Sequence, residues 1–235
     1  MSSNKSQLTL SYTNFLNMPL CIIQYIADTY LEFSDIRSLK RINKKCYKIK
    51  NINFWCTNWQ LRTKLNNNIL QKYNYIKKLD ISYNKNVTDL NYLIHLTMLD
   101  ISNCPQIKNK HIKNLTDLEE LYISDNESTI NNDGIKHLTK LTVLDIDENE
   151  NITDINTLVN LQILHARYTN LDNDGIKNIT NLTYLDLSYN NNITDISHMI
   201  NLETLMVRFS CGLRRDNIKH LEKLTDVDEH CNFDF

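Results

Sequence analysis

A nine-residue pattern recurs along most of the chain at steps of 20 to 23 residues. It has Leu or Ile at its first and fourth positions, an apolar residue at its sixth and, in most copies, Asn at its ninth. The copies begin at Ile76, Leu96, Leu118, Leu141, Leu161, Leu182 and Leu202. Self-similarity at a fixed period of this length predicts stacked repeats that share one continuous core, and it favours a binding function over a catalytic one.

This pattern resembles the leucine-rich repeat, L-x-x-L-x-L-x-x-N/C. The resemblance implies an α/β solenoid with a parallel, concave β-sheet and with short helices or turns on the convex side. Residues 76–235 are predicted to form seven repeats and a degenerate C-terminal cap that starts at Leu224. Strands stacked about 4.8 Å apart would give a sheet about 35 Å long.

The segments between the strands are of two kinds. One reads Asn-Ile/Val-Thr-Asp-Ile/Leu, and the other reads Asn-Asp-Gly-Ile-Lys. We expect the second kind to form about two helical turns that begin near Asp133 and Asp174. The Asn at the ninth position should satisfy backbone groups of neighbouring turns, with Cys104, Thr169 and Ser210 in its place in three repeats.

Composition limits the function further. The net charge is −2 and the pI is about 6.4, which argues against a nucleic-acid partner. No apolar run is long enough to cross a membrane, and no signal-peptide pattern follows Met1, so we expect a cytoplasmic or nuclear protein. The frequent Asn, Lys, Ile and Tyr are typical of AT-rich genomes such as those of some large DNA viruses, in which case the location would be a host cell. We expect a monomer outside any complex.

The first 75 residues follow a different pattern. Apolar residues recur at helical spacing from Ile22 to Ile26 and again from Ile36 to Ile42, followed by a basic run and by Trp55. We predict a flexible N-terminus over residues 1–12, a small all-α domain over 13–57, and a linker or N-terminal cap over 58–75.

The segment 13–57 resembles an F-box. Met18-Pro19-Leu20-Cys21-Ile22 is similar to the family's Leu-Pro-x-Glu-Ile/Leu, Asp35-Ile36 to its Asp-Leu, and Ile42-Asn43-Lys44-Lys45 to its Val-Ser-Lys-Arg; Cys21 and Cys46 depart from the family pattern. The resemblance implies binding of a Skp-family adaptor and, through it, of a cullin ubiquitin ligase. The adaptor-facing or motif-core residues would be Met18, Pro19, Ile22, Ile26, Ile36, Leu39 and Ile42. The alternative is that these helices only cap the solenoid.

Strand residues between the buried leucines should face the concave side, where we predict partner binding. The candidates are Asp100, Tyr122, Asp145, His165, Arg167, Tyr168, Asp186, Tyr189, Arg208 and Phe209. They form an acidic stripe with tyrosines at its edge and two arginines toward the C-terminal end. This pattern favours a groove for a basic, partly extended segment of a protein substrate. The alternative is that Asp in the central strand position only maintains solubility.

Catalytic and metal-binding motifs are absent from the sequence. There is no phosphate-binding loop, no G-x-S-x-G and no H-E-x-x-H, and the six cysteines lack zinc-like spacing, so we predict neither a cofactor nor a metal. His165, which should lie between Asp145 and Asp186, is the one arrangement that would suit a metal; a simple surface pair is the alternative. The sequence therefore predicts a substrate-recognition subunit or, alternatively, a stand-alone repeat scaffold or inhibitor.

Overall fold

The computed structural model describes residues 62–72, 74–125, 127–209 and 212–228. The chain separates into two compact units, Met1–Phe54 and Trp55–Phe235, and every described residue belongs to the second. The seven F-box-like residues from Met18 to Ile42 lie outside the described residues, as do Ser210, Cys211 and Cys231. Their proposed roles stay predictions.

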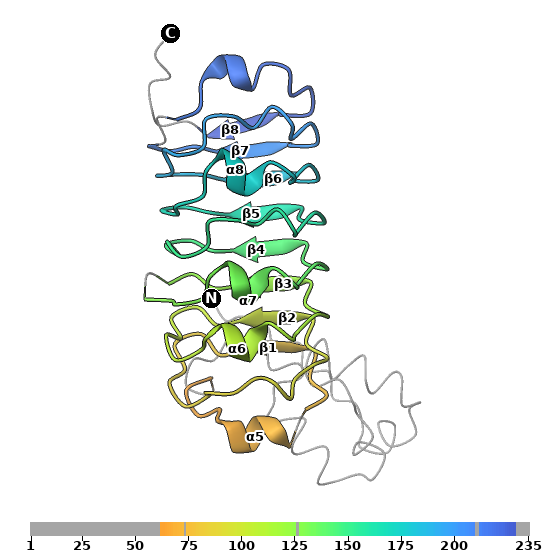
Figure 1. Cartoon of the computed structure of the whole chain (residues 1–235), viewed down its shortest axis with the longest axis vertical. Helices are drawn as coiled ribbons and strands as arrows, with labels where there is room; N and C mark the ends of the chain where they lie inside the picture. Colours follow the sequence, from red (N-terminus) through yellow and green to blue (C-terminus); the bar gives the residue numbers. More distant parts are fainter. Residues whose placement is uncertain (1–61, 73, 126, 210–211, 229–235) are drawn as a thin grey trace, which may run out of the picture. The chain divides into compact units, whose positions relative to one another are not determined.

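The described repeats carry one parallel sheet whose eight strands follow chain order (Figure 1). Each strand has three residues: β1 (Lys78–Asp80), β2 (Met98–Asp100), β3 (Glu120–Tyr122), β4 (Val143–Asp145), β5 (Ile163–His165), β6 (Tyr184–Asp186), β7 (Thr204–Met206) and β8 (Asp226–Asp228). Corresponding residues of consecutive repeats are paired, so Leu79 lies beside Leu99 and Leu99 beside Leu121.

The core forms because strand side chains alternate between the two faces of the sheet. The central residue of β1, Leu79, and the residue just after that strand, Ile81, are both 0% exposed. Leu90, Leu93 and Leu96 close the same layer from the return segment and are also fully buried. Equivalent residues repeat in each turn, so one apolar column runs the length of the stack.

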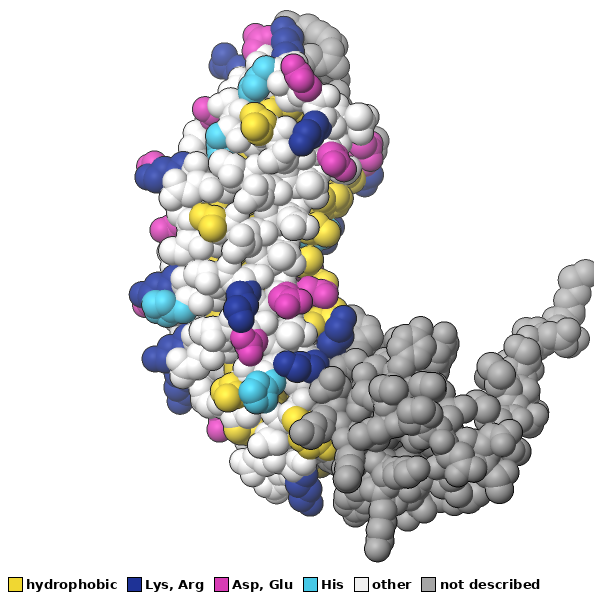
Figure 2. Space-filling view, turned by 90° about the vertical axis from the view of Figure 1, so that its right-hand side faces the viewer, with side chains coloured by type: hydrophobic (Ala, Val, Ile, Leu, Met, Phe, Trp, Pro, Cys, Tyr) yellow, Lys and Arg dark blue, Asp and Glu magenta, His cyan; other side chains and the backbone are white. Residues whose placement is uncertain are grey.

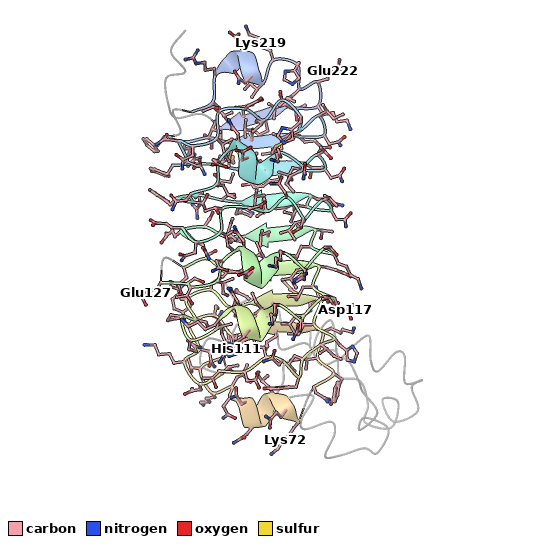
Figure 3. The ribbon with its side chains drawn as sticks, in the orientation of Figure 1. Lys72, His111, Asp117, Glu127, Lys219 and Glu222 are labelled. Atoms are coloured by element: carbon pink, nitrogen blue, oxygen red, sulfur yellow. The ribbon has the colours of Figure 1, made fainter. Side chains whose placement is uncertain are left out.

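Short helices lie on the side of the stack opposite the sheet (Figure 1). They are α5 (Asn67–Gln71), α6 (Asn109–Ile112), α7 (Asn132–Ile135), α8 (Asn173–Ile176) and the 3-10 helix η2 (Arg215–Asn217). In Figure 3, His111 lies on this helical side, and Asp117 and Glu127 lie at opposite edges of the stack.

The prediction of two helical turns at α7 and α8 was wrong. Each makes a single turn, capped by Asn131 or Asp172, because the chain then bends so that the next Leu or Ile enters the core. After α7, the Leu138 N–H donates to the Ile135 carbonyl at 2.8 Å and ends the helical geometry. A Cβ on Gly175 would come 2.1 Å from the Thr153 carbonyl oxygen, so α8 packs directly on the preceding repeat.

The ninth-position Asn satisfies backbone groups within and between repeats, as predicted. Asn149 is 0% exposed; its Oδ1 accepts from the N–H groups of Asn151 and Ile152, and its Nδ2 donates to the Ile130 carbonyl of the preceding repeat. Where Cys104 replaces Asn, its thiol lies 3.0 Å from the Ile81 carbonyl oxygen and burial raises the pKa of that thiol to about 12.

The described part of the second unit is curved in the view of Figure 2. Hydrophobic side chains follow the inner margin of this curve at mid-height. Within the described ranges, none of the helices is long and apolar enough to span a bilayer.

Candidate protein-binding face

The concave face consists of three columns of side chains and a rim. The first column contains Lys78, Met98, Glu120, Val143, Ile163, Tyr184, Thr204 and Asp226, and the second contains Asp80, Asp100, Tyr122, Asp145, His165, Asp186, Met206 and Asp228. The third column contains Ser82, Ser102, Ser124, Asp147, Arg167, Ser188 and Arg208. The rim contains Tyr83, Asn103, Asp125, Glu148, Tyr168, Tyr189 and Phe209.

The strand pairing aligns the second column as the sequence predicted, but Asp186, expected to be exposed for partner binding, is only 7% exposed, and the first column was missed. The strand pairing aligns Val143 with Ile163 and Ile163 with Tyr184, two residues before the second column in each strand. These three side chains are partly exposed. The period-two alternation that identified the second column could have found the first by counting two residues toward the N-terminus.

Most carboxylates of the second column have a structural role. Asp100 Oδ1 accepts the backbone N–H of Ser102 at 2.9 Å, and Asp186 Oδ1 accepts that of Ser188 at 2.9 Å. This N–H lies just beyond the strand, where the side chain supplies the acceptor. The recurrence of Asp at this position is therefore explained by its hydrogen bond to the backbone N–H two residues later, and it requires no binding partner.

Two repeats that lack this Asp use an acceptor from the preceding repeat. In the repeat of His165, the backbone N–H of Arg167 donates to Asp147 Oδ1 at 2.8 Å. In the repeat of Met206, the backbone N–H of Arg208 donates to Ser188 Oγ at 3.2 Å. In these two repeats the second-column side chains, His165 and Met206, are therefore not needed as acceptors for that backbone N–H.

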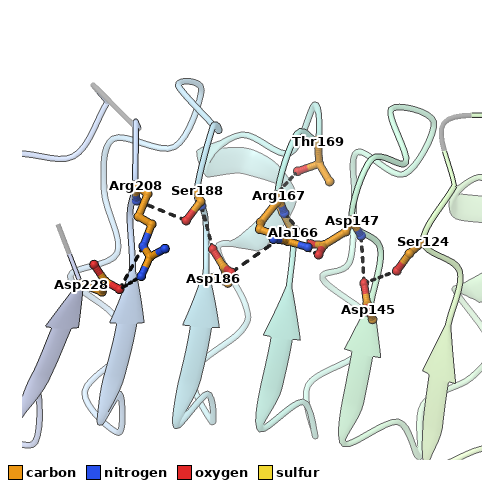
Figure 4. A network of polar contacts seen from close by, with 10 residues as sticks. All are labelled: Ser124, Asp145, Asp147, Ala166, Arg167, Thr169, Asp186, Ser188, Arg208 and Asp228. Atoms are coloured by element: carbon orange, nitrogen blue, oxygen red, sulfur yellow. Dashed lines mark hydrogen bonds and ion pairs between the residues drawn. The ribbon is translucent and has the colours of Figure 1, made fainter. Parts of the chain in front are cut away.

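Both predicted arginines are held by carboxylates (Figure 4). Arg167 Nε donates to Asp147 Oδ2 at 2.6 Å and lies 3.9 Å from Asp186 Oδ2. Arg208 Nε donates to Asp228 Oδ2 at 2.9 Å. The two arginines predicted toward the C-terminal end thus form ion pairs with acidic groups of that half.

The N-terminal half keeps more uncompensated negative charge. Among the described residues, neither Asp100 nor Asp145 has an ion-pair partner. Asp145 Oδ1 instead accepts the Ser124 hydroxyl at 2.5 Å and the Asp147 N–H at 3.0 Å. Burial raises the pKa of Asp100, and burial likewise raises the pKa of Tyr122 to about 12, with the Glu120 carboxylate adding to that rise.

Three aromatic rings are stacked along the rim. The ring centroids of Tyr168 and Tyr189 are 4.1 Å apart, and those of Tyr189 and Phe209 are 4.9 Å apart. Their exposed fractions are 48%, 39% and 50%. All three have φ between 52° and 61°, in the left-handed region that disfavours bulky residues. Tyr83, Asn103 and Glu148 share this backbone conformation, so it belongs to the turn of the repeat, and the three rings lie exposed on it.

His165 lies between Asp145 and Asp186 in the second column, as expected. Its ring packs against Tyr184, with centroids 4.9 Å apart. Across residues 62–228, outside the undescribed gaps, no cluster of His, Cys, Asp or Glu has a geometry that would hold a metal ion.

The comparisons with known proteins agree on the fold. A family model described as leucine-rich repeat matches residues 178–196. The chain is 24% identical to internalin C2 from Listeria monocytogenes, with a TM-score of 0.61, covering 77% of this chain and 80% of that one. No curated protein sequence matches.

Two further solved structures are similar over a smaller share of their own length. The functional domain of InlJ from Listeria monocytogenes is 25% identical, with a TM-score of 0.57, and covers 71% of this chain and 36% of that one. TLR13, solved in complex with the RNA ssRNA13, is 24% identical, with a TM-score of 0.53, and covers 70% of this chain and 27% of that one. The pairing of the strands, the buried Leu and Asn columns and these likenesses together show that the described residues form a leucine-rich-repeat solenoid.

Proposed function

We propose that the chain is a non-catalytic protein-interaction module whose concave face holds a segment of a partner protein. The observation that carries this proposal is the set of apolar and aromatic side chains left partly exposed on that face: Val143, Ile163, Tyr184, Tyr168, Tyr189 and Phe209. Clustered exposed apolar groups mark interaction surfaces, and aromatic residues are favoured anchors in them.

The charge of the face favours a protein over a nucleic acid. Its three columns contain eight acidic residues and three basic ones within the described repeats. A phosphate backbone would be repelled by this balance, whereas a segment with Lys or Arg would be attracted. Binding of RNA, which the TLR13 complex illustrates for that receptor, is therefore disfavoured here.

We infer from residues 13–57 a more specific role, as the substrate-recognition subunit of a Skp–cullin–F-box ubiquitin ligase in the cytoplasm or nucleus. In this role the F-box-like segment binds a Skp-family adaptor and the repeats hold the substrate. Its support is the order of motif residues from Met18-Pro19 to Trp55, followed by repeats.

Binding of purified Skp adaptor to the full chain tests the ligase role. The matched variant is Pro19→Ala/Ile22→Asp, with folding checked by circular dichroism. Adaptor binding by the wild type and its loss in the variant supports the role. A folded wild type that retains no adaptor refutes it and leaves a stand-alone scaffold.

The interaction module itself is tested separately by affinity capture. Tyr184→Thr changes the concave face, and Lys177→Ala changes an exposed residue that follows α8 on the opposite side. A partner of the concave face should be lost with the first variant and kept with the second. If every captured protein behaves identically with both variants, the concave face is not the binding site.

A further inference from the structure

Resting on the proposed function, we propose that the concave face reads a two-part protein segment: a basic cluster bound over β2–β4 and an apolar or aromatic cluster bound over β5–β7. Three independent sets of residues change character together along the solenoid, and the change falls near β4 in each.

The first column changes from polar to apolar. Its N-terminal half holds Lys78 and Glu120, whose charged groups lie 3.8 Å apart, with Met98, only 7% exposed, between them. Val143, Ile163 and Tyr184 follow in consecutive strands and are all partly exposed. A side chain placed over β5 and β6 would therefore meet aliphatic and aromatic surface, where burial of apolar groups is favourable.

From β2 onward the rim changes in the same direction, although Tyr83 beside β1 is also an exposed aromatic residue. Asn103 and Glu148 occupy it beside β2 and β4, and both have φ near 60°. The stacked rings of Tyr168, Tyr189 and Phe209 occupy it beside β5, β6 and β7. The polar and the aromatic residues have the same backbone conformation. The turn therefore does not require aromatic side chains beside β5–β7, and their presence there changes only the chemistry of the surface.

The distribution of net charge completes the division. Asp100 and Asp145 have no ion-pair partner among the described residues, so the surface over β2–β4 attracts cations. Over β5–β7, Arg167 neutralises Asp147 and approaches Asp186, so the surface there is close to neutral (Figure 4). For a ligand with basic residues along its whole length, the residues over β5–β7 would therefore add little electrostatic attraction.

The geometry sets the spacing between the two clusters. The centres of the two halves, β3 and β6, are three strands apart, which is about 14 Å at about 4.8 Å per strand. An extended segment rises about 3.3 Å per residue, so about four residues should separate the centre of the basic cluster from that of the apolar cluster.

Selection from a display library of random 16-residue peptides tests this inference on the full chain. Two variants divide the face: Asp100→Asn/Asp145→Asn for the acidic half and Tyr184→Thr for the apolar half. Asn keeps an oxygen that can accept the Ser102 and Asp147 N–H groups, and Thr already occupies the Tyr184 column at Thr204, so both variants should fold.

The selected peptides should carry a basic and an apolar cluster centred about four residues apart. The acidic-half variant should bind them about tenfold more weakly and with less dependence on salt. Removing the basic residues of the peptide should weaken its binding to the acidic-half variant little further. With Tyr184→Thr, by contrast, the losses from the protein change and from the peptide change should add.

The outcomes separate this inference from the proposed function. Peptides that lose binding to both variants but contain only one kind of cluster, or a different spacing, overturn the two-part ligand and leave concave binding intact. No selected peptide, or peptides that bind both variants as well as the wild type, overturns both.

Discussion

The buried Asn column should contribute strongly to stability, and Asn149→Ala isolates its effect. The substitution removes three hydrogen bonds: two that Oδ1 accepts, from Asn151 N at 2.9 Å and Ile152 N at 3.1 Å, and one that Nδ2 donates to the Ile130 carbonyl at 3.3 Å. With Asn149 0% exposed, water cannot readily replace them. At about 1 kcal/mol per bond, plus the penalty for buried unpaired groups, we expect a loss of about 3–4 kcal/mol in unfolding free energy.

Asn156→Ala is the matched control. It also removes three hydrogen bonds, to the Asp154 carboxylate, the Asp174 carbonyl and the Asn178 N–H, at 2.8, 2.6 and 2.8 Å. These bonds lie at the surface, so water takes over the freed groups and the expected cost is about 0.5–1 kcal/mol.

Equilibrium unfolding in urea, followed by far-ultraviolet circular dichroism, measures both costs. Ile130 belongs to the repeat before Asn149, so the loss falls partly on the coupling between repeats, and the transition of Asn149→Ala should also broaden. Equal costs for the two variants would refute the reasoning, because burial would then not decide the value of these bonds.

Three other predictions use the same unfolding measurement. Tyr83→Asn should stabilise by about 0.5 kcal/mol, because Tyr83 has φ 60° and stacks on no ring among the described residues. Tyr189→Asn should instead destabilise by about 1 kcal/mol through loss of two ring contacts. The opposite order would contradict the role of the rim stack. Burial raises the pKa of Asp100 above 3.8, so the folded protein binds the proton of this carboxyl group more tightly than the unfolded chain, and the contribution of Asp100 to stability falls as the pH rises and the proton is lost. Asp100→Asn should therefore gain stability relative to wild type between pH 3.5 and 7. A stability difference between the two proteins that does not change with pH would count against this. Gly175→Ala should cost about 3 kcal/mol, because its Cβ meets the Thr153 carbonyl at 2.1 Å; a cost below about 1 kcal/mol would show that the repeats separate easily.

Much of the repeat architecture followed from the repeat period. The position of each strand and the inward direction of residues such as Leu79 and Ile81 recur along the repeats, and an Asn like Asn84 recurs at the turn in most of them. These features depend on neighbours in the same repeat or one repeat away, and a repeating sequence places those neighbours identically each time. The second column and the rim of the concave face followed from the same alternation.

Other features required the folded structure. The packing of α8 on the preceding repeat depends on how closely Gly175 approaches Thr153, a contact between repeats that no helical propensity contains. The pairing of Arg167 with Asp147, 20 residues earlier, depends on which carboxylate a long, flexible side chain can reach once the strands are stacked. The sequence by itself therefore determined the backbone periodicity and the core, because both arise from short-range, repeated contacts. The tertiary structure decided the charge pattern of the concave face, because side-chain partners there are chosen across repeats by distance and burial.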